Sequence, residues 1–153
     1  EAYILLGLMH AETGDSVALD YYRNALKVKP QSFEAHYNMA YFYQEHGNVE
    51  RAIQFYHTII QNIDSLNKNV YFNLGYVQME YKKNYRQAAT EYTKAINLDL
   101  NYAEAFLNRG YCFEMLGDFS RAAVDYNASL QIIPNYELAV KALNRLDAKR
   151  KVK

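Results

Sequence analysis

The tetrapeptides Asn38–Tyr41 (NMAY), Asn73–Tyr76 (NLGY) and Asn108–Tyr111 (NRGY) begin at intervals of 35 residues. An aromatic residue or histidine lies two places before each Asn: His36, Tyr71 and Phe106. A small residue lies two places after it: Ala40, Gly75 and Gly110. A motif that returns at a fixed period indicates a repeat architecture, in which each repeat is one small unit that packs on the next.

A second motif follows the first in every copy. Alanine is followed four residues later by tyrosine at Ala18–Tyr22, Ala52–Tyr56, Ala88–Tyr92 and Ala122–Tyr126. An earlier copy of the first motif is supplied by Tyr3, Leu6 and Gly7. These positions divide the chain into four units, at about 1–30, 33–64, 68–100 and 103–134.

The two motifs resemble those of the tetratricopeptide repeat, a unit of about 34 residues that reads aromatic-x-x-Leu-Gly-x-x-Tyr, then Ala-x-x-x-Phe/Tyr, then Pro. Pro30 and Pro134 close the first and fourth units, whereas Asp64 and Leu100 hold this place in the second and third. The resemblance implies an all-α fold, a right-handed superhelical solenoid of antiparallel helix pairs with a concave and a convex side.

Each unit contains one turn between two helical patterns, at Gly14-Asp15, Gly47-Asn48, Lys83-Asn84 and Gly117-Asp118. Glycine ends a helix without steric cost, and Asp or Asn caps the next helix. The third unit lacks this glycine and has one extra residue near it. We therefore expect a longer loop and a slightly extended first helix there. In each unit the alanine of the second helix should pack on the small residue of the first.

The segment after the fourth unit predicts a capping helix at 135–150. Its apolar residues fall on one face: Ala139, Ala142, Leu143 and Leu146. Its polar residues should point to solvent: Lys141, Asn144, Arg145 and Lys149. We interpret 1–153 as a single domain and as a piece of a longer protein, because Glu1 opens the chain inside an apolar pattern.

The Asn and Tyr of the first motif point away from the buried side of their helix, because successive residues turn by about 100°. In the tetratricopeptide repeat family this side lines the concave groove. The predicted groove residues are Asn38, Tyr41, Asn73, Tyr76, Asn108, Tyr111, Tyr37 and Phe72. Acidic residues should form the rim: Glu34, Glu45, Glu80, Glu104 and Glu114.

An Asn amide has a donor and an acceptor, which match the two polar groups of a peptide backbone, and Tyr adds rigid contact area. The groove is therefore predicted to bind an extended segment of another protein. The alternative is that each Asn only supports the neighbouring helix. Family members that bind chaperone C-termini carry Lys and Arg on this face, where this chain has Ile4, Tyr37, Phe72 and Leu107. The acidic rim instead favours a polar or basic segment.

Composition limits the other functions. Lys+Arg and Asp+Glu both number 17, so a nucleic acid partner is not expected. No apolar run approaches the roughly 18 residues of a membrane span. The four histidines belong to separate predicted helices, and Cys112 has no histidine in reach. We expect no metal, no cofactor and no catalysis.

Two further features distinguish the first and last units. Ile4, Leu5 and Leu8 form an exposed apolar patch on the groove side, which either an upstream part of the protein covers or a hydrophobic ligand side chain occupies. A structural module that self-associates, as a homo-oligomer, is the alternative function. In the last unit, Arg109 replaces a buried Leu or Met, so we predict a partly buried salt bridge with Asp125.

Overall fold

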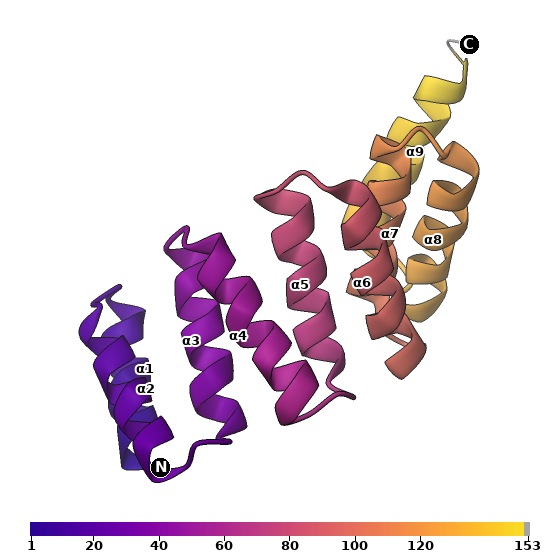
Figure 1. The fold of residues 1–153 in the computed structure, drawn as a ribbon. Coiled ribbons are helices and arrows are strands. Elements are labelled where there is room, and N and C mark those ends of the chain that lie inside the picture. Colours follow the sequence, from indigo (N-terminus) through magenta and orange to yellow (C-terminus); the bar gives the residue numbers. More distant parts are fainter. Residues whose placement is uncertain (152–153) are drawn as a thin grey trace. The chain divides into compact units, whose positions relative to one another are not determined.

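The computed structural model describes residues 1–151, and within that range it contains nine α-helices and no strand (Figure 1). The helices are α1 (Ala2–Glu12), α2 (Val17–Val28), α3 (Phe33–Glu45), α4 (Val49–Asn62), α5 (Lys68–Glu80), α6 (Tyr85–Leu98), α7 (Ala103–Met115), α8 (Phe119–Ile132) and α9 (Glu137–Lys151). The predicted all-α arrangement of four helix pairs and a last helix is confirmed.

The chain divides into two compact units, one up to Val70 and one from Tyr71 onward. In the first unit, α1 packs on α2, α2 on α3, and α3 on α4. In the second unit, α6 packs on α7, α7 on α8, and α9 covers α8 and α7. Residues of α5 and α6 also share one apolar cluster in the second unit.

The core repeats one tyrosine in every helix pair. Tyr22, Tyr56, Tyr92 and Tyr126 are at most 1% exposed, and the alanines four residues before them are fully buried. In three pairs the tyrosine ring lies over a glycine of the first helix: Gly7, Gly75 and Gly110. We expected the alanine to make this contact, but the ring is larger and reaches further. A methyl group on Gly75 would lie 2.8 Å from the Tyr92 ring.

The turns inside the helix pairs follow the predicted chemistry. Gly14, Gly47 and Gly117 have φ angles of 71°, 74° and 80°, a region that glycine adopts without strain. The next helix is then capped by a side-chain oxygen that accepts from a backbone N–H, as Asn48 does from Arg51 and Asp118 from Arg121. The predicted caps are thus confirmed in the second and fourth pairs, whereas α2 begins after Ser16 without a side-chain cap.

The third helix pair has the same turn conformation and the same kind of cap, although it has no glycine in the turn. Lys83 has a φ angle of 51°, and Asn84 caps α6. The loop there runs from Tyr81 to Asn84 and is longer than the one from His46 to Asn48, as expected. The expected extension of the first helix is wrong, since α5 has 13 residues, as α3 and α7 do. Because Lys83 adopts the left-handed conformation itself, the helix stops at its usual place.

The polar face of α9 corrects one prediction. Ala139, Ala142 and Leu146 are buried as expected. However, Arg145 and Lys149 are only partly directed to solvent, because both pair with Glu114 on α7 at 2.7 and 2.8 Å. Glu114 is only 4% exposed and therefore is not a rim residue. The last helix is attached to its neighbours by charge as well as by apolar packing.

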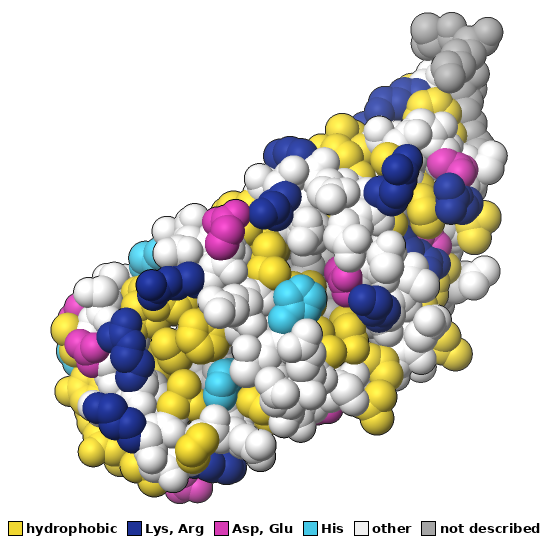
Figure 2. Space-filling view, in the orientation of Figure 1, with side chains coloured by type: hydrophobic (Ala, Val, Ile, Leu, Met, Phe, Trp, Pro, Cys, Tyr) yellow, Lys and Arg dark blue, Asp and Glu magenta, His cyan; other side chains and the backbone are white. Residues whose placement is uncertain are grey.

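Helix α1 is less buried than its pattern predicted. Tyr3 and Leu6, expected on the buried side, are 41% and 39% exposed, and only Gly7 of this helix is fully buried. Apolar residues occur on all sides of α1, and in the first unit α2 and α3 cover only part of them. Elsewhere too, on the face drawn in Figure 2, apolar side chains reach the surface between scattered basic ones.

Candidate functional site

The Asn and Tyr residues of the repeated tetrapeptide lie on α3, α5 and α7. Asn38, Asn73 and Asn108 are all half-buried. Of the tyrosines, Tyr41 is 49% exposed, while Tyr76 and Tyr111 are half-buried. All six side chains therefore retain surface that another molecule can reach.

In the first unit, four predicted site residues line one cavity of about 200 Å³ between α1 and α3: Leu8, Asn38, Tyr41 and Glu45. The other lining residues are Ala11, Glu12, Tyr22, Phe42 and His46. The cavity is smaller than a typical small-molecule site, which measures roughly 300 Å³ or more. Its volume suits a single side chain of a ligand.

In the second unit, Asn108 has a structural role as well. Its Nδ2 donates to the Tyr92 hydroxyl at 3.3 Å, which links α7 to α6. The neighbouring tyrosines make ring contacts: Tyr76 meets Tyr81 edge-on at 6.3 Å, and Tyr111 meets Tyr85 at 6.2 Å. Asn108 therefore supports a neighbouring helix through its amide nitrogen, as the alternative interpretation of this motif predicts. Its carbonyl oxygen makes no such bond.

Two predicted groove residues contribute to packing, which the sequence did not indicate. Tyr37 meets the buried Tyr56 edge-on at 6.1 Å. Phe72 meets the buried Tyr92 at 5.5 Å and stacks on Tyr102 at 5.0 Å. Both remain half-buried, so each ring presents one side to the core and the other to the surface.

The four acidic residues of the predicted rim are exposed, unlike Glu114. The backbone N–H of Glu34 and the Ser32 hydroxyl hold the pKa of Glu34 below its usual value. Glu45 accepts from the Gln44 amide at 3.3 Å, and Glu80 pairs with Lys83 at 3.4 Å. Glu104 is the fourth. All four carboxyl groups lie on the surface of the protein.

The predicted apolar patch is divided between two cavities. Leu8 lines the small cavity described above, whereas Ile4 and Leu5 line a second one of about 580 Å³ that includes Val28 and Lys29. Leu5 is 63% exposed and Leu8 is 40% exposed, as expected for surface residues, and Ile4 is half-buried. The three side chains do not form one pocket.

One functional position was missed by the sequence reasoning. It lies eight residues after the leading aromatic of each repeat and faces the hydroxyl of the buried tyrosine. Tyr56 donates to Gln44 at 3.0 Å, and Tyr126 donates to Glu114 at 2.6 Å. Tyr92 contacts the Met79 sulfur at 3.8 Å. The first repeat has Ala11 at this position, and aligning the four units by their first motif would have identified the exception.

Comparison with known proteins agrees with the repeat motifs. Three sequence models described as tetratricopeptide repeat match residues 21–54, 69–102 and 103–136. The chain belongs to the tetratricopeptide repeat family. A search of curated protein sequences gives no match.

Several solved structures resemble this tetratricopeptide repeat chain. The crystal structure of MamA has a TM-score of 0.86 at 21% identity, over 98% of this chain and 81% of MamA. PilF of Pseudomonas aeruginosa has a TM-score of 0.84 at 27% identity, over 98% of this chain and 68% of PilF. The second repeat domain of human RPAP3, solved in complex with the HSP70 peptide SGPTIEEVD, has a TM-score of 0.69 at 28% identity, over 73% of this chain and 92% of that domain.

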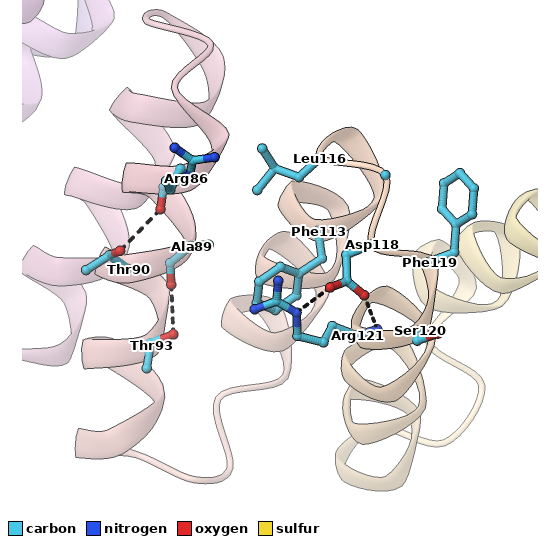
Figure 3. A pocket seen from close by; sticks show the side chains of 11 residues that line it. Arg86, Ala89, Thr90, Thr93, Phe113, Leu116, Asp118, Phe119, Ser120 and Arg121 are labelled. Atoms are coloured by element: carbon cyan, nitrogen blue, oxygen red, sulfur yellow. Dashed lines mark hydrogen bonds and ion pairs between the residues drawn. The ribbon is translucent and has the colours of Figure 1, made fainter.

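Another cavity, in the second unit of the repeat chain, lies apart from the Asn and Tyr residues of that unit. It measures about 870 Å³ and lies between α6 and the turn that joins α7 to α8 (Figure 3). Its polar side chains largely bond to one another or to their own helix: Thr90 donates to the Arg86 carbonyl, and Arg121 pairs with Asp118. This leaves few groups directed at a ligand.

The histidine, cysteine and acidic side chains of this repeat chain are the possible metal ligands, and the structure does not bring them together as a metal site among the described residues. Among the described residues, no group of three or more His, Cys, Asp and Glu could hold a metal ion. His36 is buried against Phe55, and its Nδ1 bonds the Ser32 carbonyl at 2.8 Å. Burial raises the pKa of the Cys112 thiol to about 12, so it is not a nucleophile at neutral pH. None of the described helices has the length and apolar character of a membrane span.

Proposed function

We propose that this chain is a binding module whose Asn and Tyr side chains on α3, α5 and α7 hold an extended, polar or basic segment of another protein. The observation that supports the proposal is the cavity in the first unit, which Asn38, Tyr41 and Glu45 line together. Half-buried amides and tyrosines can bond a peptide backbone while leaving its side chains free to vary.

The proposed ligand differs from the peptide bound by the RPAP3 domain. That peptide, SGPTIEEVD, is acidic and ends in a carboxylate. At the places where the family holds such a terminus with Lys and Arg, this chain has Ile4, Tyr37, Phe72 and Leu107. The exposed carboxylates of the rim would repel an acidic ligand, and they favour a basic one.

A peptide array tests the proposal. Wild-type protein is applied to immobilised peptides of basic, neutral and acidic composition, and the affinities of hits are measured by calorimetry. We expect basic, extended peptides to bind, and Asn73→Ala to weaken them by about 1–3 kcal/mol through an unpaired backbone group. Asn97→Ala is the matched control, since Asn97 is an exposed amide on α6. Equal effects of the two variants, or no binding peptides, would contradict the proposal.

The exposed apolar side chains of α1 favour one second candidate, association of the chain with itself. Leu5 and Met9 are 63% and 66% exposed and Leu8 of the same helix is 40% exposed, so α1 presents several apolar side chains to solvent together. Light scattering over a range of protein concentrations tests this. A mass that rises with concentration and returns to the monomer in Leu5→Lys would support self-association, and a constant monomer mass would reject it.

A further inference from the structure

The first helix pair lacks a side chain that the other three pairs have. The hydroxyl of the buried tyrosine meets Gln44, Met79 or Glu114 in those pairs. Ala11 stands at this position in the first pair, and its methyl group cannot accept a hydrogen bond. The space that a longer side chain fills elsewhere is here the cavity of about 200 Å³, which Ala11 and Tyr22 both line.

Two polar side chains of this cavity, Tyr22 and Asn38, make no hydrogen bond among the described residues. Tyr22 is 1% exposed, and among the residues whose side chains the structure describes its hydroxyl makes no hydrogen bond. The same holds for the Asn38 amide, whereas its counterpart Asn108 donates to Tyr92. The Tyr22 oxygen is not among the fully enclosed polar atoms, so the small exposed part of this residue leaves its hydroxyl open to the cavity. The cavity therefore favours an occupant with a polar group that reaches Tyr22.

The charged side chains around the cavity indicate which polar group an occupant should carry. Two carboxylates line it, Glu12 and Glu45, and no Lys or Arg does. His46 also lines it, with its Nδ1 against the Phe42 carbonyl at 2.7 Å, which makes that nitrogen the donor and leaves Nε2 as an acceptor in the neutral ring. A cation is thus attracted, and an anion is repelled.

We propose that this cavity binds one lysine side chain of the extended segment, an inference that rests on the proposed function. The aliphatic stem lies against Leu8 and the ring of Phe42, because both line the cavity. The ammonium group donates to the Tyr22 hydroxyl oxygen, to the Asn38 carbonyl oxygen and to Glu12. Lysine has three donors and no acceptor, which suits a cavity lined by several side-chain oxygens and by no Lys or Arg.

Small probes test the cavity without a known partner. The uniformly ¹⁵N-labelled chain is titrated with N-acetyl-lysine N-methylamide and, separately, with N-acetyl-norleucine N-methylamide, which has the stem without the ammonium group. We expect the lysine probe to shift the amide signals of Ala11 and Asn38 and to bind about tenfold more tightly than norleucine. Equal binding of the two probes, or lysine shifts confined to other residues, would overturn the proposal.

Two substitutions sharpen the test. Ala11→Gln copies the side chain of Gln44, fills the cavity and gives Tyr22 an acceptor, so it should abolish lysine binding and raise the melting temperature. Ala148→Gln, on an exposed site of α9, is the matched control and should do neither. Glu12→Gln removes one carboxylate that has no partner among the described residues, and should weaken the lysine probe without loss of stability.

The two proposals can fail separately. If basic peptides bind and Asn73→Ala weakens them, while Ala11→Gln leaves their lysine preference unchanged, the lysine site is wrong and the binding module stands. If Ala11→Gln abolishes lysine binding while no peptide binds, the cavity is supported and the extended-segment proposal is wrong. Unchanged lysine binding in Ala11→Gln protein with intact helicity would reject the cavity under either result.

Discussion

Arg109 on α7 and Asp125 on α8 form a salt bridge with two hydrogen bonds, each 2.8 Å long. The side chains are 18% and 4% exposed, so the pair is largely removed from water. Arg109 also donates to the Thr93 hydroxyl on α6 at 3.0 Å. The predicted partly buried salt bridge is confirmed, and it joins three helices of the second unit.

The single variants of this pair should be less stable than the double one. Asp125→Ala leaves a guanidinium without its partner in a half-buried site, and we expect a loss of about 3–5 kcal/mol. The double variant Arg109→Met/Asp125→Phe has the residues of the second repeat at these positions, Met39 and Phe55. It should lose less stability than Asp125→Ala does. Urea unfolding followed by circular dichroism measures both. A double variant less stable than either single one would contradict this account.

The exposed pair of Arg121 and Asp118 is a natural control for that experiment. Its two side chains are 64% and 33% exposed and lie three residues apart at the start of α8. Water screens such a pair, so Arg121→Ala should change the free energy of unfolding by at most about 1 kcal/mol. A larger loss of stability in Arg121→Ala would show that solvent exposure does not explain the different contributions of the two salt bridges.

Glu114 makes stability depend on pH. Burial alone would raise its pKa, but hydrogen bonds from Arg145, Lys149 and Tyr126 lower it from 4.5 to about 2. The unfolded chain therefore binds the proton first, and the stabilisation is complete above pH 4.5 and is lost as the pH falls towards 2. Glu114→Gln should cost about 3 kcal/mol at neutral pH and less at pH 2.

Denaturation curves at pH 7, 4 and 2.5 test the sign of this effect. Glu80→Gln is the control, because Glu80 is exposed and pairs with Lys83 at the surface. We expect the control to follow the wild type at every pH, and Glu114→Gln to lose part of the wild-type slope between pH 4 and 2.5. Parallel curves for wild type and Glu114→Gln would exclude Glu114 as the titrating group.

The sequence predicted best those features that recur in each repeat. The four helix pairs, the turns within them and the pair of Arg109 with Asp125 all follow from comparing one position across four copies. Glu114 was misplaced on the rim because its partners Arg145 and Lys149 belong to α9, which lies outside the repeats. No periodicity relates that helix to the others, so a contact made only there has no counterpart from which to infer it.

The first unit was mispredicted for a related reason. A repeat pattern assumes that each helix has a neighbour on both sides, but in the first unit α1 packs on α2 and α3 alone. Tyr3 and Leu6 hold positions that are buried in other repeats, and here they are exposed. The cavity beside Ala11 likewise arises because the first repeat has a short side chain where the others have Gln44, Met79 and Glu114. A motif built from shared residues does not predict such a difference.

The glycine of the first motif should not tolerate even a methyl group. In Gly75→Ala the new carbon would lie 2.8 Å from the Tyr92 ring, which is fully buried and has no space to move. We expect a loss of about 1–3 kcal/mol, although alanine favours helix formation more than glycine does. The second repeat has Ala40 at this position and permits the opposite substitution. Ala40→Gly should lower the free energy of unfolding by about 1 kcal/mol, because glycine favours the helix less than alanine does. A more stable Gly75→Ala protein would contradict the close packing.

Two asparagines of the repeated tetrapeptide should respond differently to the same substitution. Asn108→Ala removes the donor that bonds the Tyr92 hydroxyl at 3.3 Å, so we expect a loss of about 1 kcal/mol in stability. Asn38 makes no hydrogen bond among the described side chains, so Asn38→Ala should leave the melting temperature nearly unchanged.

Thermal unfolding of the two variants, followed at 222 nm, separates a supporting Asn from one kept for a ligand. If both variants are destabilised equally, Asn38 supports its neighbours as Asn108 does. That result would favour the interpretation that the motif is purely structural. If only Asn108→Ala is destabilised and Asn38→Ala instead loses affinity for basic peptides, the same residue serves packing in one repeat and recognition in another. We expect the second result, because Asn38 borders a cavity to which the Tyr22 hydroxyl is open, whereas Asn108 donates to the corresponding hydroxyl of Tyr92.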